Sequence, residues 1–189
     1  MWLHSILNHG TRMSRTTDAL LLLARVRQGQ VQVEPVDMAA IVAEVCQRLA
    51  GTIDQYQAEI VTPPAWPAAA GYGPWLEEVW ANLIDNAIKY GGRPPRVELG
   101  YTRGAEKVPA PQAGMIEFWV RDNGSGLTPE EQAHLFQPFL SRPRGTGHGL
   151  GLSIARRIVD RLGGHVWVAS EGIAGQGATF SFTLPGAAG

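Results

Sequence analysis

Four glycines stand close together in the stretch GTGHGLGLSIARRIV, where Gly145, Gly147, Gly149 and Gly151 directly precede a helical pattern. Glycine lets the backbone approach another group closely, and the first turn of a helix has N–H groups without intrahelical partners. The stretch is therefore suited to holding a phosphate, although taken alone it fits a flexible surface loop equally well.

Two common nucleotide-binding motifs are excluded for this stretch. A P-loop requires Gly-Lys followed by Ser or Thr, and neither of the two lysines, Lys89 and Lys107, follows a glycine. The dinucleotide fingerprint requires glycine at its first, third and sixth positions, and the sixth position here is Leu150 or Leu152, depending on the register. What remains is a glycine-rich loop that leads into a helix N-terminus.

A carboxylate beside glycines marks a second candidate site, in the stretch VRDNGSGLTPEE. Asp122 ends an apolar segment with strand character, and Gly124 and Gly126 follow it. A calcium loop is excluded, because the glycines occupy ligand positions and Ala133 replaces the closing glutamate. An ordinary turn is one interpretation. The other is that the carboxylate accepts a hydrogen bond from a flat base that enters at the sheet edge. A further pair, Gly175 and Gly177, precedes the last strand-like segment and alone indicates only a hairpin turn.

A polar stripe on a predicted helix is the third candidate. In EEVWANLIDNAIKYGG, the spacings of four, four and three between Glu78, Asn82, Asn86 and Lys89 place these residues near one helical face. An asparagine oxygen can ligate Mg²⁺, and Lys89 could reach a phosphate. A solvated polar face would explain any one of these residues, but it explains the whole set poorly.

Hydrophobic periodicity predicts the elements that position these residues. The predicted helices cover about residues 2–28, 37–49, 74–90 and 150–162, with a short helix beginning near 128–130. The predicted strands cover residues 95–102, 115–122, 165–170 and 178–184, and extended pieces broken by prolines lie within 58–69. A long solitary helix followed by mixed helices and antiparallel strands predicts an arm and an α+β fold, a two-layer α/β sandwich.

The composition limits the function classes. The net charge of −1 over 189 residues gives no overall field that would attract nucleic acid or an anionic membrane. The longest apolar run, residues 19–24, is too short to span a bilayer, and no signal peptide is evident, so we expect a soluble, intracellular-type domain. Cys46 is the single cysteine, which excludes a disulfide framework, and its helical spacing predicts a buried core thiol rather than a nucleophile.

Five segments resemble, in order, the N, G1, F, G2 and G3 boxes of histidine kinases, which belong to the GHKL ATPase superfamily with its Bergerat fold. The segments are NLIDNAIKYGG, DNGSG, LFQPF, GTGHGLGLSIARRIV and GQGATFSFTLP. The resemblance covers about residues 36–185, and the stretch TTDALLLLARVRQGQVQVEPVDM resembles the end of a second dimerisation helix. We therefore expect residues 1–33 to be the C-terminal part of a dimerisation and phosphoacceptor hairpin, and residues 34–189 to be the catalytic ATP-binding domain.

The resemblance implies a role for residues in each box. Asp122 would accept a hydrogen bond from the adenine amino group, and Asn86 would ligate Mg²⁺. Asn82, Lys89 and Arg142 would form the catalytic set, with Lys89 and Arg142 contacting phosphate. The nucleotide would also contact Tyr90, Gly124, Gly126, Phe136, Phe139, Gly145, Thr146, Gly147, His148, Gly149, Leu150, Gly177 and Thr179.

Two features of the sequence depart from the family pattern. The lid segment LSRPRGTG is short, so its closure would depend on Arg142 and Arg144 more than usual. Ser125 replaces the more usual apolar residue between the two glycines of the G1 box, which is a mild change.

Position 82 separates the chemistries of this superfamily. In the resembling hydrolases, the residue one turn before the Mg²⁺ asparagine is a glutamate that activates water. Here it is Asn82, which is neutral and cannot act as a general base near neutral pH. Glu78 lies one turn further back, about 6 Å along the helix, and we expect it not to be the base.

The sequence therefore favours a sensor histidine kinase that transfers the γ-phosphoryl group of ATP to a histidine. The alternative is a GHKL ATPase or a non-enzymatic module switched by nucleotide. His4 and His9 have no neighbouring carboxylate, so we expect the chain to begin within the second helix and the acceptor histidine to lie outside it. The implied partners are ATP, a phosphoacceptor helix of the same or a partner subunit, and a response-regulator receiver domain. We also expect a homodimer of the full-length protein and a cytoplasmic location for this domain.

Overall fold

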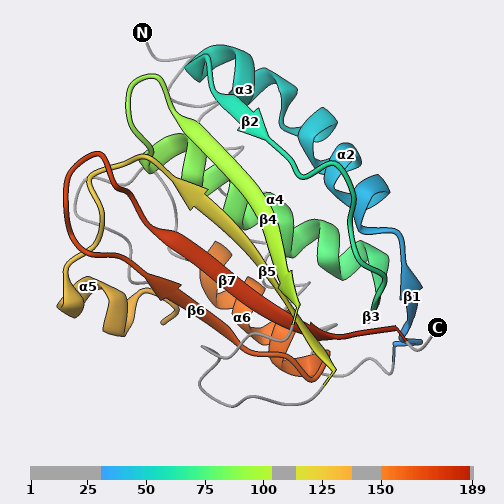
Figure 1. Cartoon of the computed structure of the whole chain (residues 1–189). Coiled ribbons are helices and arrows are strands. Elements are labelled where there is room, and N and C mark those ends of the chain that lie inside the picture. Colours follow the sequence, from blue (N-terminus) through green and yellow to red (C-terminus); the bar gives the residue numbers. More distant parts are fainter. Residues whose placement is uncertain (1–30, 104–113, 138–149, 188–189) are drawn as a thin grey trace, which may run out of the picture.

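A five-stranded mixed sheet forms one layer of the fold, in the strand order β2-β4-β5-β7-β6 (Figure 1). The computed structural model describes residues 31–103, 114–137 and 150–187. The strands are β2 (Glu59–Val61), β4 (Arg96–Arg103), β5 (Met115–Asp122), β6 (Val166–Ala169) and β7 (Thr179–Pro185). The antiparallel pairing expected for residues 95–102 and 115–122 is confirmed as β4 and β5. Strand β2 instead runs parallel to β4, because the chain returns to the sheet through a helix.

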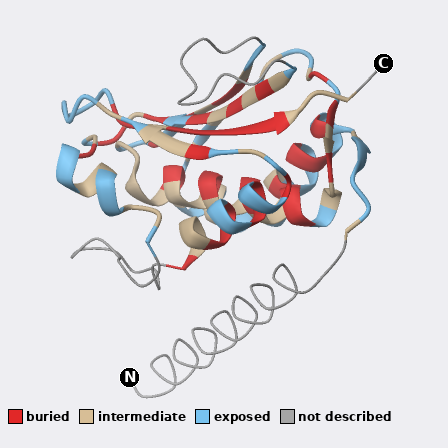
Figure 2. Cartoon of the chain, turned by 90° about the horizontal axis from the view of Figure 1, so that it is seen from below, coloured by how far each residue is buried: buried red, intermediate tan, exposed pale blue. Residues whose placement is uncertain are grey.

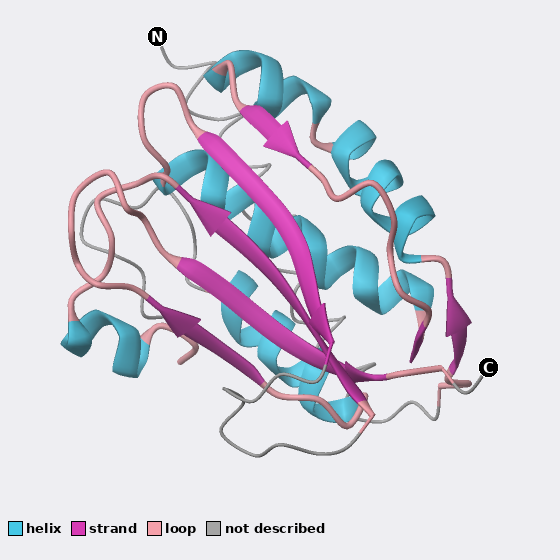
Figure 3. Ribbon diagram, in the orientation of Figure 1, coloured by secondary structure: helices cyan, strands magenta, loops and turns pink. Residues whose placement is uncertain are grey.

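The helices lie together on one face of this sheet (Figures 2 and 3). Those that pack on the sheet or on one another are α2 (Met38–Arg48), α3 (Ala50–Tyr56), α4 (Gly73–Tyr90) and α6 (Gly151–Arg161), and the short α5 (Pro129–His134) follows β5. A separate pair of strands, β1 (Glu34–Val36) and β3 (Ala69–Gly71), is antiparallel. The expected α+β class with two layers is confirmed.

Local sequence signals account for the helix boundaries. The Asp37 side chain accepts a hydrogen bond from the N–H of Ala40 and begins α2. Thr128 and Glu131 form a reciprocal capping box that begins α5, and α4 ends at Gly91, as predicted. Helix α3 was not predicted, because its seven residues have no side-chain cap and continue directly from α2.

Large aromatic side chains fix the central helix α4 on the sheet. Trp80 of α4 is fully buried against Phe118 and Phe182, with ring centroids 6.2 and 5.2 Å away. The indole N–H of Trp80 also donates to the sulfur of Met38, 3.0 Å away on α2. Because α4 is anchored in this way, the polar residues of its C-terminal half have a defined position relative to the ends of the strands.

The structure tests the prediction for Cys46 but not the prediction of an N-terminal helical arm. Cys46 was predicted to be buried and is instead half-buried against the core, where desolvation raises the pKa of its thiol. The helix expected over residues 2–28 lies outside the described residues, and the boundary near residue 33 stays a prediction. In the part of the chain that the structure describes, no helix has both the length and the apolar character needed to cross a membrane.

Candidate functional site

The carboxylate of Asp122 lies at the end of β5, on the side of the sheet that faces the helices. Residues 116, 118, 120 and 122 of this strand are all buried, and Asp122 is 7% exposed. Its Oδ1 accepts a hydrogen bond from the N–H of Gly124 at 2.8 Å, and its own N–H donates to the carbonyl of Ala178 at 3.0 Å. The alternation of the strand therefore places an acid where a core residue would otherwise lie.

Two glycines, Gly124 and Gly177, lie against this carboxylate, where no side chain fits. A Cβ on Gly124 would come within 2.8 Å of Asp122 Oδ1 and closer still to the carbonyl of Tyr90. A Cβ on Gly177 would come within 2.6 Å of the same Oδ1, and Gly177 also has a positive φ of 66°. Gly126, at φ 74°, would collide with Ser170. Gly124 of the G1 box and Gly177 of the G3 box thus form a cradle around Asp122, whereas Gly126 packs against Ser170.

Hydrogen bonds join the two glycine loops and α5 into one unit. The carbonyl of Gly124 accepts from the N–H groups of Gly175 and Gly177 at 2.8 and 3.1 Å. Ser170 Oγ accepts from the N–H of Leu127 at 2.9 Å and donates to the carbonyl of Gly177 at 2.7 Å. In Figure 1 both loops lie at the same end of the sheet as α5.

Gln132 extends this unit to α5. Its Nε2 donates to the carbonyls of Leu127 and Ser170 at 3.0 and 2.9 Å. Sequence reasoning did not identify Ser170 or Gln132. Neither belongs to a motif with a known spacing, and their partners lie as far as 43 residues away along the chain.

Asn82 of the polar stripe on α4 lies against the N-terminus of α6. Asn82 Nδ2 donates to the carbonyl of Glu78 at 2.8 Å, while its Oδ1 lies so close to Gly151 that a Cβ there would collide with it. Asn86 is half-buried one turn further along the helix, and Lys89 forms an ion pair with Asp85. The N box and the start of the G2-box helix therefore meet at Asn82 and Gly151.

Glu78 contacts α2 instead of α6. Its carboxylate forms an ion pair of 2.9 Å with Arg48, whose guanidinium also donates to the carbonyl of Glu77 at 3.2 Å. This contact agrees with the expectation that Glu78 does not serve as a base at the site.

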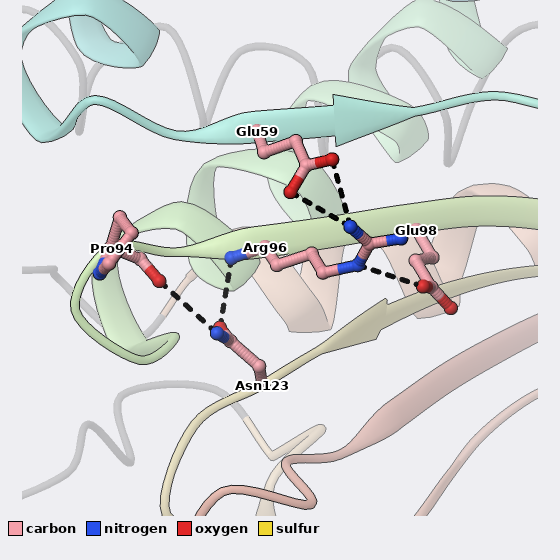
Figure 4. A network of polar contacts seen from close by, with 5 residues as sticks. All are labelled: Glu59, Pro94, Arg96, Glu98 and Asn123. Carbon is pink, nitrogen blue, oxygen red and sulfur yellow. Dashed lines mark hydrogen bonds and ion pairs between the residues drawn. The ribbon is translucent and has the colours of Figure 1, made fainter.

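Asn123, next to Asp122, was not among the predicted site residues. Its Oδ1 accepts from the N–H of Gly92 at 2.9 Å. The same oxygen accepts from the N–H of Arg96 at 2.9 Å, and Nδ2 donates to the carbonyl of Pro94 at 3.1 Å (Figure 4). The sequence shows that a residue able to form hydrogen bonds follows the end of the strand. It does not indicate that one of its partners, Gly92, lies 31 residues away.

Several predicted residues lie outside the described part of the chain: Phe139, Arg142, Gly145, Thr146, Gly147, His148 and Gly149. Of the others, Leu150 is buried at the start of α6, and Phe136 packs half-buried against the core. Thr179 is the first residue of β7, in register with Arg121. The roles of all these residues stay predictions.

The donor set around α4 fits a hard cation held by oxygen. Among the described residues, no group of three His, Cys, Asp or Glu side chains could hold a metal ion. A divalent cation here would depend on the amide oxygen of Asn86 together with phosphate and water oxygens, which is the ligand type that Mg²⁺ prefers.

The sandwich, the buried acid and its glycine cradle define an ATPase domain of the Bergerat type. The model of the histidine kinase-, DNA gyrase B-, and HSP90-like ATPase family matches residues 71–188, and the chain belongs to this family. The family and the fold expected from the five boxes are thereby confirmed.

Two curated relatives match most of the chain. Cyanobacterial phytochrome B of Nostoc sp. is 35% identical over 178 residues, and the methanogenesis regulatory histidine kinase FilI of Methanothrix harundinacea is 32% identical over 177 residues. Each match covers 92% of this chain but only 22% and 19% of those proteins. The chain therefore spans about a fifth of the length of these relatives.

Solved structures share the fold. Full-length ShkA in complex with AMPPNP has a TM-score of 0.78 at 26% identity, over 100% of this chain and 39% of ShkA. The histidine kinase ThkA, solved in complex with the response regulator TrrA, has a TM-score of 0.71 at 19% identity, over 94% of this chain and 49% of ThkA. At that identity, the likeness to ThkA shows the fold alone.

Proposed function

We propose that this chain is the ATP-binding catalytic part of a sensor histidine kinase. The observation that carries the proposal is Asn82. A neutral carboxamide occupies the position where a hydrolase would need a base, and it is bonded to its own helix and packed against Gly151. Without a base to activate water, the γ-phosphoryl group is retained until another nucleophile arrives.

The nucleotide would bind across the loop end of the sheet. Asp122 would accept a hydrogen bond from the adenine amino group, and the glycines beside it would let the flat ring approach. Asn86 would supply an oxygen to Mg²⁺, which would neutralise phosphate charge when bound. Lys89, released from Asp85, and Arg142 would contact the phosphates. The N–H groups around Gly145 to Gly151 would cover the phosphates at the start of α6.

In the transfer step, an imidazole nitrogen attacks the γ-phosphorus. The bond from that phosphorus to the β–γ bridging oxygen breaks, and ADP leaves. The protein contributes positioning and electrostatic stabilisation, as is usual for phosphoryl transfer. The phosphohistidine then passes its phosphoryl group to an aspartate of a response regulator.

Partners and location form part of the same proposal. The complex of ThkA with TrrA supports a receiver domain as the partner, and the AMPPNP complex of ShkA supports ATP as the nucleotide. We further propose that the full-length protein is a homodimer, that the acceptor helix comes from the same or the partner subunit, and that this domain is cytoplasmic.

The test is phosphoryl transfer between two polypeptides. The chain is incubated with Mg²⁺ and γ-labelled ATP, alone and with a fragment that carries the acceptor helix of the parent protein. We expect acid-labile phosphohistidine on the added fragment and none on this chain. The control is the same fragment with its acceptor histidine changed to glutamine.

Two results would contradict the proposal. Steady release of inorganic phosphate without any transfer would favour an ATPase or a nucleotide-switched module. Labelling of this chain alone, abolished by His4→Gln or His9→Gln, would mean that the acceptor lies within it.

A further inference from the structure

The side chain of Asn123 satisfies three backbone groups of a single loop, the segment of residues 92–96 between α4 and β4. The N–H of Gly92 donates to its Oδ1. The N–H of Arg96 donates to the same oxygen, and the carbonyl of Pro94 accepts from its Nδ2 (Figure 4). A Cβ on Gly92 would come within 2.9 Å of Nδ2, so the loop lies directly on the amide group. Asn123 therefore supplies the hydrogen-bond partners that the backbone of this loop requires.

The same contacts explain where the β4–β5 ladder ends. The last pair in register is Val97 with Asp122, so the next pair would be Arg96 with Asn123. There the side chain of Asn123, rather than a backbone carbonyl, accepts the N–H of Arg96. The backbone after Asp122 can therefore turn away from β4 and form the glycine loop.

This turn brings the end of α4 against the glycine cradle. A Cβ on Gly124 would collide with the carbonyl of Tyr90 and would lie 3.3 Å from the Cα of Gly91. Gly91 is also close to the amide, since a Cβ there would lie 3.3 Å from Asn123 Oδ1. The backbone of residues 90–92 thus packs against Gly124, next to the Asp122 carboxylate. Asn123 holds this backbone, which would form a wall of the proposed base site.

The solvent side of the loop has contacts of another kind. The Arg96 guanidinium pairs with Glu59 at 2.8 Å and with Glu98 at 3.0 Å, and Arg93 lies 5.1 Å from the ring centre of Tyr56. Because Arg93, Arg96 and Glu59 are exposed, water screens these contacts, and they do not reach the cradle. Asn123 is half-buried and connects the loop to the site itself.

We infer that Asn123 is a positioning residue for the nucleotide base: it keeps the backbone of Tyr90 and Gly91 against Gly124, so that the base meets Asp122 in one geometry. The inference rests on the proposed function, because it requires a purine at this carboxylate. The inference predicts a change in nucleotide selectivity. If the backbone of Tyr90 and Gly91 is held less firmly, ATP should lose more affinity than a purine nucleotide that has no amino group at this position.

The experiment compares ATP with inosine triphosphate, which has a carbonyl where adenine has its amino group. Calorimetry gives both dissociation constants for the wild type, Asn123→Ala, Asn123→Asp and Arg96→Ala. The last variant is the matched control, since it removes the guanidinium pairs but keeps the N–H that Asn123 binds. Thermal unfolding without nucleotide shows whether each variant is folded.

We expect Asn123→Ala to weaken ATP binding about tenfold, because three backbone groups lose their partner, and to lower the preference for ATP over inosine triphosphate. Asn123→Asp should fall between this variant and the wild type, since it keeps the acceptor for two N–H groups but repels the carbonyl of Pro94. Arg96→Ala should keep both affinity and preference. If Asn123→Ala does not fold, the change of preference in Asn123→Asp decides.

Three results would overturn the inference while leaving the proposed function intact. They are an unchanged ATP affinity in Asn123→Ala, an equal loss for both nucleotides, and an equal loss in Arg96→Ala. A wild-type chain that binds neither nucleotide would instead refute the proposed function, and the inference with it.

Discussion

The helix-facing interior and the loop end of the same sheet are built by different means. In the interior, Trp80, Phe118 and Phe182 are fully buried and pack ring against ring. At the loop end, four residues after Phe118 on β5, the side chains of Asp122 and Asn123 accept hydrogen bonds from backbone N–H groups. Glycines there allow a close approach that a Cβ would prevent. Stability and site geometry therefore depend on separate residues, and substitutions should separate them.

The largest effect on stability should come from the interior. Trp80→Ala should lower the free energy of unfolding by about 3–5 kcal/mol, because it leaves a large cavity and removes the partner of Met38. Ile173→Ala is the control: it shortens an apolar side chain that is 48% exposed, and it should change stability by less than about 0.5 kcal/mol. Urea unfolding measures both. Similar losses of unfolding free energy in the two variants would mean that stability does not depend mainly on the interior.

The largest effect on binding should come from the cradle. Gly177→Ala forces a Cβ against Asp122 and should weaken ATP binding about a hundredfold, or roughly 2.7 kcal/mol. Gly175→Ala is a matched control in the same loop, since its φ of 86° carries the same backbone strain while nothing lies within 4 Å of the added Cβ. It should lose some stability but keep most of its affinity. Equal loss of affinity in both variants would show that strain, and not contact with Asp122, is the cause.

A smaller effect should reveal the contact between α4 and α6. Gly151→Ala should destabilise the fold by about 1–3 kcal/mol, because the added Cβ meets Asn82 Oδ1. In the Asn82→Ala background the same substitution should cost less, with a coupling of at least about 0.5 kcal/mol in a double-mutant cycle. Additive effects in urea unfolding would mean that the two residues do not meet.

The smallest effect should come from the exposed ion pair between α4 and α2. Arg48 and Glu78 are 43% and 36% exposed, so Glu78→Gln should cost less than about 1 kcal/mol in unfolding free energy. Because Glu78 has no part in the transfer step, the rate of phosphohistidine formation should be unchanged. A large fall in that rate would give Glu78 a role as a base.

Much of the fold was predictable because its signals are local. Alternation along residues 115–122 predicted β5, and the position of Asp122 on the buried face follows from the same period. The cap at Asp37 and the stop at Gly91 gave helix limits that the structure confirms. Motifs identified the glycines of the two loops. The structure shows why glycine is needed at Gly124 and Gly177, since a Cβ at either position would collide with Asp122.

The missed features depend on contacts between distant segments. The parallel pairing of β2 with β4 joins residues 37 positions apart, and no pattern within β2 specifies its direction. The side chain of Asn123 reaches a loop 31 residues away, and Ser170 binds Leu127 across 43 residues. A single sequence shows that such residues can form hydrogen bonds, but only the fold determines with which partners.

Calorimetry of ATP binding to the wild type and to Asp122→Asn tests the central claim most directly. Asparagine keeps an oxygen that can accept from the N–H of Gly124 and removes the charge. We therefore expect the variant to fold normally and to bind Mg²⁺-ATP about tenfold to a hundredfold more weakly, because a charge-assisted hydrogen bond to the adenine amino group is lost. An unchanged dissociation constant would contradict the assignment of this end of the sheet as the nucleotide site.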